Sequence, residues 1–137
     1  MVSKVIISII MIKNFLIVKY IGKDDKLGLR INKDFFMYKL TNLKNKNEDL
    51  VKQILYFLNV HKVNLDKNFS IIVNRGPGSF SGIRIALSVA MGLKISKKVK
   101  LYGYIDTNLK VFNQENIEEL LNKKLLEKNL IKPIYLS

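Results

Sequence analysis

The chain has no cysteine and no tryptophan, and its 137 residues include only two prolines and one histidine. Without cysteine, disulfide bonds and thiolate zinc sites are both excluded. The single histidine, His61, has no acidic residue or second histidine beside it in the sequence, so we assign it no catalytic or metal-binding chemistry. The absence of cysteine fits a reducing compartment, and we expect a cytoplasmic protein.

Acidic residues are also scarce. The chain has 11 Asp and Glu against 24 Lys and Arg, which gives a formal net charge of +13. An excess of this size is typical of nucleic-acid-binding proteins. However, the lysines are scattered along the chain among abundant Asn and Ile, whereas phosphate binding requires clustered positive charge. We therefore favour a solvated lysine-rich surface over a dedicated RNA groove, and the total charge alone does not decide whether RNA is contacted.

The N-terminal apolar run is short. It extends from Val5 to Ile12, whereas a helix needs about 20 apolar residues to span a bilayer, so we expect no membrane association. No small-x-small cleavage site follows the run, which makes a signal peptide a poor interpretation. We interpret residues 1–10 as an extension outside the folded domain. We favour Met11 over Met1 as the true start of the protein, but the sequence does not decide between them.

The spacing of apolar residues changes along the chain and predicts one α/β domain. Three consecutive strands are expected first, then a helix, a strand, a second helix and a fifth strand, in the order βββαβαβ. The expected strands are residues 15–21, 27–31, 35–40, 69–73 and 99–105, and the expected helices are residues 48–60 and 81–95. An amphipathic helix is expected within residues 113–130, and its apolar side is expected to carry Ile117, Leu120, Leu121, Leu125 and Leu130. A short tail follows. This order predicts a mixed five-stranded sheet.

Three of the seven glycines lie in a short stretch before the second helix, from Gly76 to Gly82. A Walker A loop is excluded, because Gly82 is followed by Ile83 and Arg84 instead of Lys and Ser or Thr. The spacing G-x-G-x-x-x-G is close to a dinucleotide fingerprint, so a nucleotide-binding module or enzyme that uses this loop is kept as the alternative. A structural role explains more residues: Gly76-Pro77-Gly78 forms a rigid turn, and Ser79 or Ser81 caps the following helix.

The two helices carry wide apolar faces. From Gly82 to Leu93 the only charged residue is Arg84, and a helix that is apolar on nearly every side needs cover on nearly every side. One small sheet covers one face only, so the excess apolar surface indicates an outside partner. The residues expected at this partner interface are Leu50, Ile54, Leu58, Leu87, Ala90 and Met91.

The glycine loop resembles a family signature. Residues 76–85 read G-P-G-S-F-S-G-I-R-I and are similar to the G-P-G-S-F-T-G-[LIV]-R-[IL] motif of the TsaB family, with Ser81 where Thr is usual. The positions that carry the motif are Gly76, Pro77, Gly78, Ser79, Phe80, Ser81, Gly82 and Arg84. The ending Pro133-Ile134-Tyr135-Leu136 resembles the family's Pro-x-Tyr-hydrophobic ending. The similarity covers about residues 11–106 and the last few residues.

This resemblance implies a fold and a function. The fold is a single actin-like (ribonuclease-H-like) lobe over residues 11–107, with the second lobe replaced by a helix and tail over residues 108–137. The function is that of a non-catalytic subunit, which supports TsaD when threonylcarbamoyl is transferred to adenosine in tRNA. Its helices 48–60 and 81–95 pair with a TsaD-like subunit. A TsaE-like ATPase in a larger complex and a homodimer of the chain when alone are left open by the sequence. Direct tRNA contact is left open.

The chain also departs from the family pattern. Lys19 stands where related ATPases have an acid that helps to hold a metal ion and phosphates, and a charged lysine cannot ligate Mg²⁺. ATP hydrolysis in this fold needs a cleft between two lobes, and one lobe is expected here. We therefore expect no catalytic residue, no cofactor and no metal in this chain.

Overall fold

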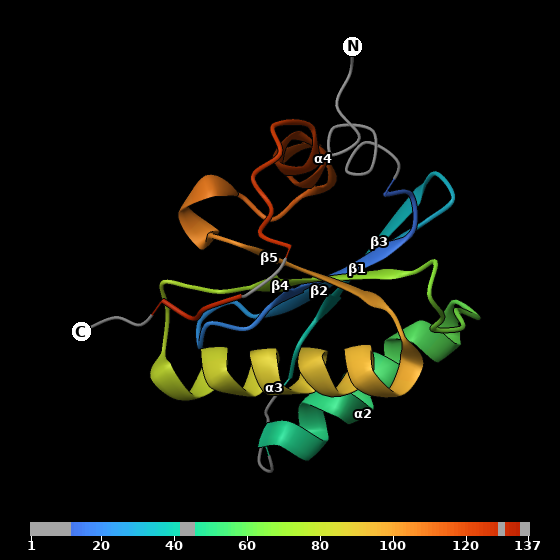
Figure 1. The fold of residues 1–137 in the computed structure, drawn as a ribbon, viewed down its shortest axis with the longest axis horizontal. Helices are drawn as coiled ribbons and strands as arrows, with labels where there is room; N and C mark the ends of the chain where they lie inside the picture. The colour runs from blue at the N-terminus through green and yellow to red at the C-terminus, as the bar shows by residue number, and fades with distance from the viewer. Residues whose placement is uncertain (1–11, 42–45, 129–130, 135–137) are drawn as a thin grey trace.

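The computed structural model describes residues 12–41, 46–128 and 131–134. The expected extension, residues 1–10, lies outside these ranges, as do Leu130, Tyr135 and Leu136. Within the described residues one sheet carries helices on both of its faces (Figure 1).

The sheet is mixed, as predicted. Its strands are β1 (Phe15–Lys19), β2 (Lys26–Ile31), β3 (Asp34–Lys39), β4 (Ser70–Asn74) and β5 (Lys100–Tyr104), in the spatial order β3-β2-β1-β4-β5. β1 pairs antiparallel with β2 and parallel with β4, so Ile17 lies between Gly28 and Ile72. β2–β3 is the expected hairpin, and β4–β5 is parallel.

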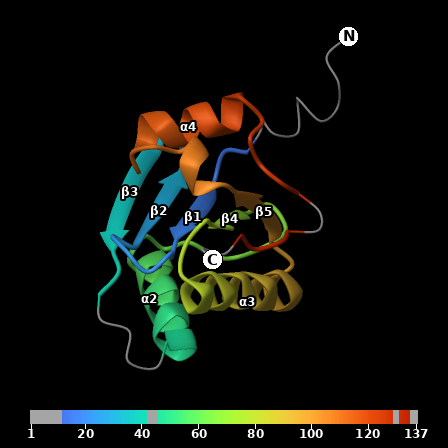
Figure 2. The same ribbon diagram turned by 90° about the vertical axis from the view of Figure 1, so that its left-hand side faces the viewer.

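Two helices cover one face of the sheet. They are α2 (Lys46–Val60) and α3 (Phe80–Lys97), which lie side by side in both views (Figures 1 and 2). The stripe Leu50, Ile54, Phe57 and Leu58 of α2 is buried against this face. The same core contains fully buried side chains from β1, β2, β4 and β5. β3 contributes Phe36 and Tyr38, which are half-buried and pack against this core. Alternation along the strands sends their other side chains to the opposite face.

The opposite face is covered by α4 (Gln114–Asn122), which follows a 3₁₀ turn (Asp106–Asn108) in the chain (Figure 2). Ile117, Leu120 and Leu121 of α4 are buried there. Their core partners are Ile12, Phe15, Ile17, Ile72, Tyr102, Tyr104, Leu109 and Phe112. The sheet is therefore the middle of three layers.

The C-terminal helix is shorter than expected. It begins after Asn113, whose side chain accepts a hydrogen bond from the N–H of Asn116 at 2.8 Å. It ends at Asn122, and Lys124 has a left-handed backbone with φ 58°. Leu125, expected on its apolar side, lies beyond the helix and is 37% exposed. Apolar periodicity continued past the point where the backbone reverses, so the prediction of this helix extended too far.

β1 also ends earlier than expected, at Lys19 rather than Ile21. The Asp25 carboxylate accepts hydrogen bonds from the N–H groups of Ile21 (2.8 Å) and Gly22 (3.1 Å). These bonds turn the chain toward β2 and remove Ile21 from the strand. A side chain that captures backbone donors in this way competes with the sheet ladder.

His61 has a packing role. Its ring stacks on Phe36 with centroids 4.0 Å apart and meets the edge of Phe57 at 5.2 Å. These two rings come from β3 and α2, so His61 closes the corner between that strand and that helix.

Candidate functional site

The glycine loop follows β4 at the carboxyl edge of the sheet, and its shape is fixed from inside the molecule. Asn74 is fully buried. Its side-chain oxygen accepts a hydrogen bond from the N–H of Gly76 at 2.7 Å, and its amide nitrogen donates to the Asp106 carboxylate at 3.0 Å. The N–H of Asp106 donates to the Gly76 carbonyl at 2.9 Å. Gly76 has φ 110°, a conformation that favours glycine.

The second half of the loop starts α3. Of the two serines that the sequence allowed as caps, Ser79 is the one observed: its hydroxyl oxygen accepts a hydrogen bond from the N–H of Gly82 at 3.2 Å. A Cβ on Gly82 would lie 2.7 Å from that oxygen and 3.3 Å from the Tyr20 carbonyl oxygen. Gly82 therefore allows the first turn of α3 to approach both its own cap and the end of β1.

Several backbone donors of the loop are already used within the chain. The N–H groups of Gly76 and Gly82 donate to the side chains of Asn74 and Ser79, and the N–H of Ser79 donates to the Ile21 carbonyl at 2.9 Å. A phosphate-binding loop presents such donors to its ligand. The geometry therefore favours the structural interpretation of the motif over the nucleotide-binding alternative.

A shallow pocket of about 360 Å³ lies beside the loop, between Asp25, Lys39 and Ser81. Burial raises the pKa of the Asp25 carboxyl, against the opposing effects of its backbone hydrogen bonds and of the nearby Lys19 ammonium. The Asp25 carboxylate is therefore used by its own turn, where it accepts hydrogen bonds from the N–H groups of Ile21 and Gly22. Among the residues that the structure describes, no three His, Asp or Glu side chains lie together as a metal site.

Part of the exposed face of α3 is formed by small and apolar residues, beside the exposed charged residues Arg84, Lys94 and Lys97. Met91 is 44% and Ile95 69% exposed, Gly92 is exposed between them, and Ser88 is exposed one turn earlier. A Cβ on Gly92 would lie more than 4 Å from every side chain of the described residues. Small residues on a helix face let another backbone approach closely, so this face has the composition of a helix-packing surface.

Comparisons with known proteins agree with this architecture. No family model and no curated protein matches the chain. Among solved structures, YeaZ from Pseudomonas aeruginosa matches with a TM-score of 0.63 and 20% identity over 71% of this chain. An uncharacterized protein with similarity to peptidase YeaZ, from the same organism, matches with the same TM-score and identity.

The chain has a YeaZ-like fold. YeaZ is a TsaB protein, so the fold expected from the glycine-loop motif is confirmed. The matches cover 46% and 45% of the two solved chains, which means that this chain spans less than half their length. In the part of the chain that the structure describes, no helix is both long enough and apolar enough to cross a bilayer.

Within this YeaZ-like lobe, four of the six expected interface residues are not at the surface. Leu50, Ile54, Leu58 and Ala90 are each at most 2% exposed and belong to the core under the sheet. Leu87 is half-buried, and only Met91 is exposed. α2 and α3 use these residues to cover their own sheet, so the exposed interface candidates are neighbouring residues.

The motif residues are divided between loop and helix. Gly76, Pro77, Gly78 and Ser79 form the turn, while Ser81, Gly82 and Arg84 lie in the first turns of α3, with Ser81 and Arg84 exposed. Phe80 begins α3, and its side chain lies outside the described part of the structure. Gly78 lies against the turn that follows β1: a Cβ there would come within 2.6 Å of the Ile21 side chain.

Arg75 has a role in the YeaZ-like lobe that the sequence pattern did not indicate. Its Nε donates to the Lys132 carbonyl at 2.8 Å, its carbonyl accepts from the N–H of Ile134 at 2.6 Å, and its Nη1 lies 3.3 Å from the Glu127 carboxylate. Arg75 therefore binds the C-terminal segment beside the glycine loop. The only signal in the sequence was the resemblance of residues 133–136 to the family ending.

Proposed function

We propose that the chain is a non-catalytic interaction subunit that supports a TsaD-like subunit during threonylcarbamoyl transfer to adenosine in tRNA. The observation that carries the proposal is the exposed face of α3 (Ser88, Met91, Gly92 and Ile95) on a YeaZ-like lobe. The glycine-loop motif, which positions the start of this helix, supports the same conclusion.

The expected partner contacts involve α2 and α3, as the resemblance to the TsaB family implies. On α3 a partner helix would lie over Gly92, where no side chain of the described residues comes within 4 Å of the place a Cβ would occupy. Met91 and Ile95 would pack on either side of it, and the apolar area they lose to water would favour association. On α2, Leu55 and Val60 are exposed apolar residues, at 44% and 53%.

The subunit's contribution is structural rather than chemical. It holds the TsaD-like subunit in its active arrangement, and ATP and metal ions bind to partner proteins, among them a TsaE-like ATPase in a larger cytoplasmic complex. When a TsaD-like subunit is absent, the same apolar face makes a homodimer of this chain. Contact with tRNA is not required by this mechanism.

A matched pair of variants at Gly92 tests the proposal. Gly92→Leu places a large side chain in the centre of the face, and binding to the TsaD-like subunit of the same organism should fall at least tenfold, which corresponds to about 1.4 kcal/mol. Gly92→Ala is the control, because its methyl group meets open space and improves helix propensity. Isothermal titration calorimetry measures both affinities, and tRNA modification is measured after depletion of the protein and complementation with each variant.

If Gly92→Leu binds the TsaD-like subunit as tightly as the natural chain does, the α3 face is not the interface. If depletion leaves tRNA modification unchanged, the proposed function is wrong. The nucleotide alternative predicts instead that ATP or NADPH raises the melting temperature of the isolated chain, because a ligand that binds only the folded state stabilises it.

A further inference from the structure

Three lysines that are separated in the sequence lie side by side in the sheet. Lys19 of β1 is directly opposite Lys26 of β2, and Lys26 is directly opposite Lys39 of β3. Side chains at directly opposite positions point to the same face, and neighbouring strands are about 4.8 Å apart, so these residues form a lysine row about 10 Å long. Positive charge that is scattered in the sequence is therefore clustered here by the fold.

The lysine row lies on the α4 side of the sheet, at the end that α4 does not cover. Alternation along β1 places Lys19 on the same face as Ile17, which packs in the core on the α4 side. The next row toward α4 is Ile17, Gly28 and Met37, in which Ile17 and Gly28 are buried but Met37 is already 52% exposed. In Figure 2 the arrowhead of β3 points away from α4, and Lys39 is the last residue of that strand.

The charge of the lysine row is not neutralised within the described part of the chain. No ion pair or hydrogen bond there involves any of its three ammonium groups. The Asp25 charge attracts the Lys19 ammonium, but the carboxylate is used by backbone N–H groups of its own turn. Like charges at directly opposite positions destabilise a sheet. Such departures from the rules of local stability are expected at functional sites.

The chemistry of the lysine row favours phosphate over carboxylate. A carboxylate is planar and suits the two-pronged arginine side chain, whereas lysine binds phosphate as a point charge. Arg30, which lies on the same face, is already paired with Glu118 at 2.6 Å. A single nucleotide needs a concave pocket, whereas three charges in a line on a strand surface match a repeated phosphate. We propose that the lysine row binds consecutive phosphates of a nucleic-acid backbone.

The surroundings of the lysine row favour a nucleic acid over a membrane surface. A peripheral membrane site combines positive charge with several large apolar side chains that enter the lipid. Among the strand residues of the described structure, Met37 is the one large apolar side chain that is exposed. Electrostatic attraction alone is sufficient for a protein to bind a nucleic-acid backbone without sequence preference.

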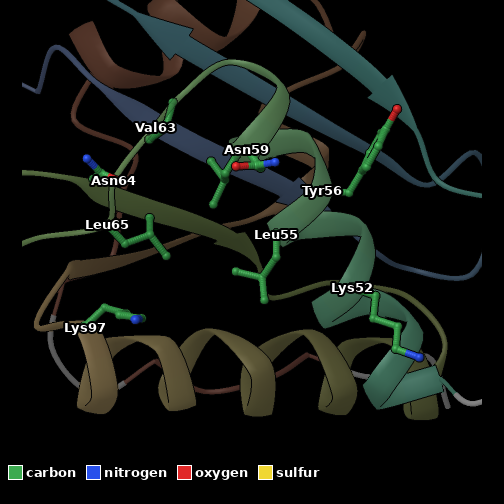
Figure 3. A pocket seen from close by; sticks show the side chains of 9 residues that line it. Lys52, Leu55, Tyr56, Asn59, Val63, Asn64, Leu65 and Lys97 are labelled. Atoms are coloured by element: carbon green, nitrogen blue, oxygen red, sulfur yellow. The ribbon is translucent and has the colours of Figure 1, made fainter.

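The lysine row is separate from the surfaces used in the proposed function. Those surfaces belong to α2 and α3, which cover the other face of the sheet. The groove of about 580 Å³ between α2 and the last turn of α3 (Figure 3) is lined by Lys52 and Lys97 but by no member of the row. A nucleic acid bound at the row therefore leaves α2 and α3 accessible to a TsaD-like subunit.

Fluorescence anisotropy of the full-length protein tests the inference. The probe is a fluorescein-labelled oligouridylate of twenty nucleotides, titrated at several salt concentrations. The row variant carries Lys19→Gln, Lys26→Gln and Lys39→Gln together, and at low salt it should bind the probe at least tenfold more weakly. For single strands, log affinity falls against log salt with a slope of about −0.7 per phosphate contacted, so the magnitude of the slope should decrease by about 2. An oligodeoxythymidylate of the same length should show the same losses, because both backbones present phosphates.

A second triple variant of equal net charge is the matched control. Lys13, Lys33 and Lys67 are exposed at the opposite end of the sheet, before β1, in the β2–β3 turn and before β4. Their joint replacement by glutamine should leave the affinity within about threefold of that of the natural chain. Lys26→Arg keeps the central charge and should bind within twofold. The melting temperature of the row variant should equal or exceed that of the natural chain, because repulsion between like charges is removed.

The proposal is overturned if the row variant keeps the affinity and salt slope of the natural chain, or if the control variant loses as much affinity. A loss confined to one of the two oligonucleotides also overturns it, since the backbone phosphates would not be the feature recognised. So does a failure of oligouridylate to bind while phosphatidylglycerol vesicles bind in a manner that the row variant abolishes, because the surface would then recognise a membrane.

The test is independent of the proposed function. The row variant should bind the TsaD-like subunit as tightly as the natural chain does, and Gly92→Leu should keep its affinity for oligouridylate. Failure of the proposed function therefore shows in Gly92→Leu and the TsaD-like subunit, and failure of this inference shows in the row variant and the oligonucleotides.

Discussion

Asn74 illustrates how single residues determine the site. Both ends of its buried side-chain amide are used, one by the Gly76 N–H and the other by the Asp106 carboxylate. An apolar residue here would leave both partners without these hydrogen bonds, and each buried unsatisfied polar group costs about 1–3 kcal/mol. The loop conformation is therefore stabilised by the interior of the protein and requires no bound ligand.

The roles of Asn74 and Arg75 could not be predicted from the sequence, because their partners are distant in the chain. Asp106 is 32 residues from Asn74, and Lys132 is 57 residues from Arg75. By contrast, the Ser79 cap could be narrowed to two serines, since capping acts over three residues. Local chemistry was thus readable from the sequence, and long-range polar contacts were not.

Tyr104 offers a prediction at this scale. Its ring is fully buried, and its hydroxyl makes no hydrogen bond within the described part of the chain. The Asn74 side chain lies near this hydroxyl and lowers its pKa, but this effect is smaller than that of burial. Burial raises the Tyr104 pKa well above its usual value. Tyr104→Phe should therefore retain or raise stability, by up to about 1 kcal/mol, because it removes an unsatisfied buried hydroxyl. Urea unfolding monitored by circular dichroism measures the change.

Leu101→Ala serves as the comparison for Tyr104→Phe, since it removes buried methyl groups from the neighbouring core and should cost about 2–5 kcal/mol. A loss of more than about 1 kcal/mol in Tyr104→Phe would contradict the prediction and would mean that the hydroxyl has a stabilising partner.

At the scale of elements, α3 shows why the interface residues were only partly predictable. Ala90 and Met91 are neighbours in the stretch of α3 from Gly82 to Leu93, in which Arg84 is the only charged residue, yet Ala90 is 2% exposed and Met91 44%. Because apolar residues occur on nearly every side of α3, periodicity does not identify the inward face. On α2 the stripe was clear, and the error was to assign Leu50, Ile54 and Leu58 to a partner when the chain's own sheet covers them.

Ala90→Glu should therefore prevent folding rather than only weaken partner binding. The Ala90 side chain packs in the core between the helices and the sheet, where a carboxylate has no cation to pair with and an unpaired buried charge costs several kcal/mol. Thermal unfolding should show a large decrease in melting temperature or no cooperative transition. Ser88→Glu, two residues earlier and exposed, should change the melting temperature by only a few degrees. A folded Ala90→Glu variant with a melting temperature close to that of the natural chain would contradict the placement of Ala90 in the core.

At the scale of the whole molecule, the mixed character of the sheet, whose strands lie in the order β3-β2-β1-β4-β5, follows from features that the sequence contains. Consecutive strands joined by a short polar turn form hairpins, and strands joined through a helix become parallel, so βββαβαβ leads to a mixed sheet. The sequence did not reveal which elements cover which face. In the structure α2 and α3 cover one face of the sheet, and α4 covers the other. The resemblance implied a helix and tail after the lobe but did not say where the helix would pack.

The contribution of α4 to the fold leads to the last prediction. Phe112, Ile117, Leu120 and Leu121 complete the core over Phe15, Ile17 and Ile72, and Arg30 of β2 forms an ion pair with Glu118 of α4 at 2.6 Å. Loss of one buried leucine costs about 2–5 kcal/mol, and whole domains are stable by only about 5–15 kcal/mol.

Removal of residues 111–137 should therefore abolish cooperative unfolding and produce a species that binds the dye ANS, because the apolar face of the sheet loses its cover. Leu120→Ala should remain folded but lose about 2–5 kcal/mol of stability, which separates the effect of the core from that of the missing chain. Deletion of residues 1–10 is the matched truncation: it keeps Ile12, which is buried against this core, and should leave the melting temperature within a few degrees. If the chain without residues 111–137 unfolds cooperatively, the sheet with α2 and α3 is stable alone, and α4 is an addition to the lobe rather than part of its core.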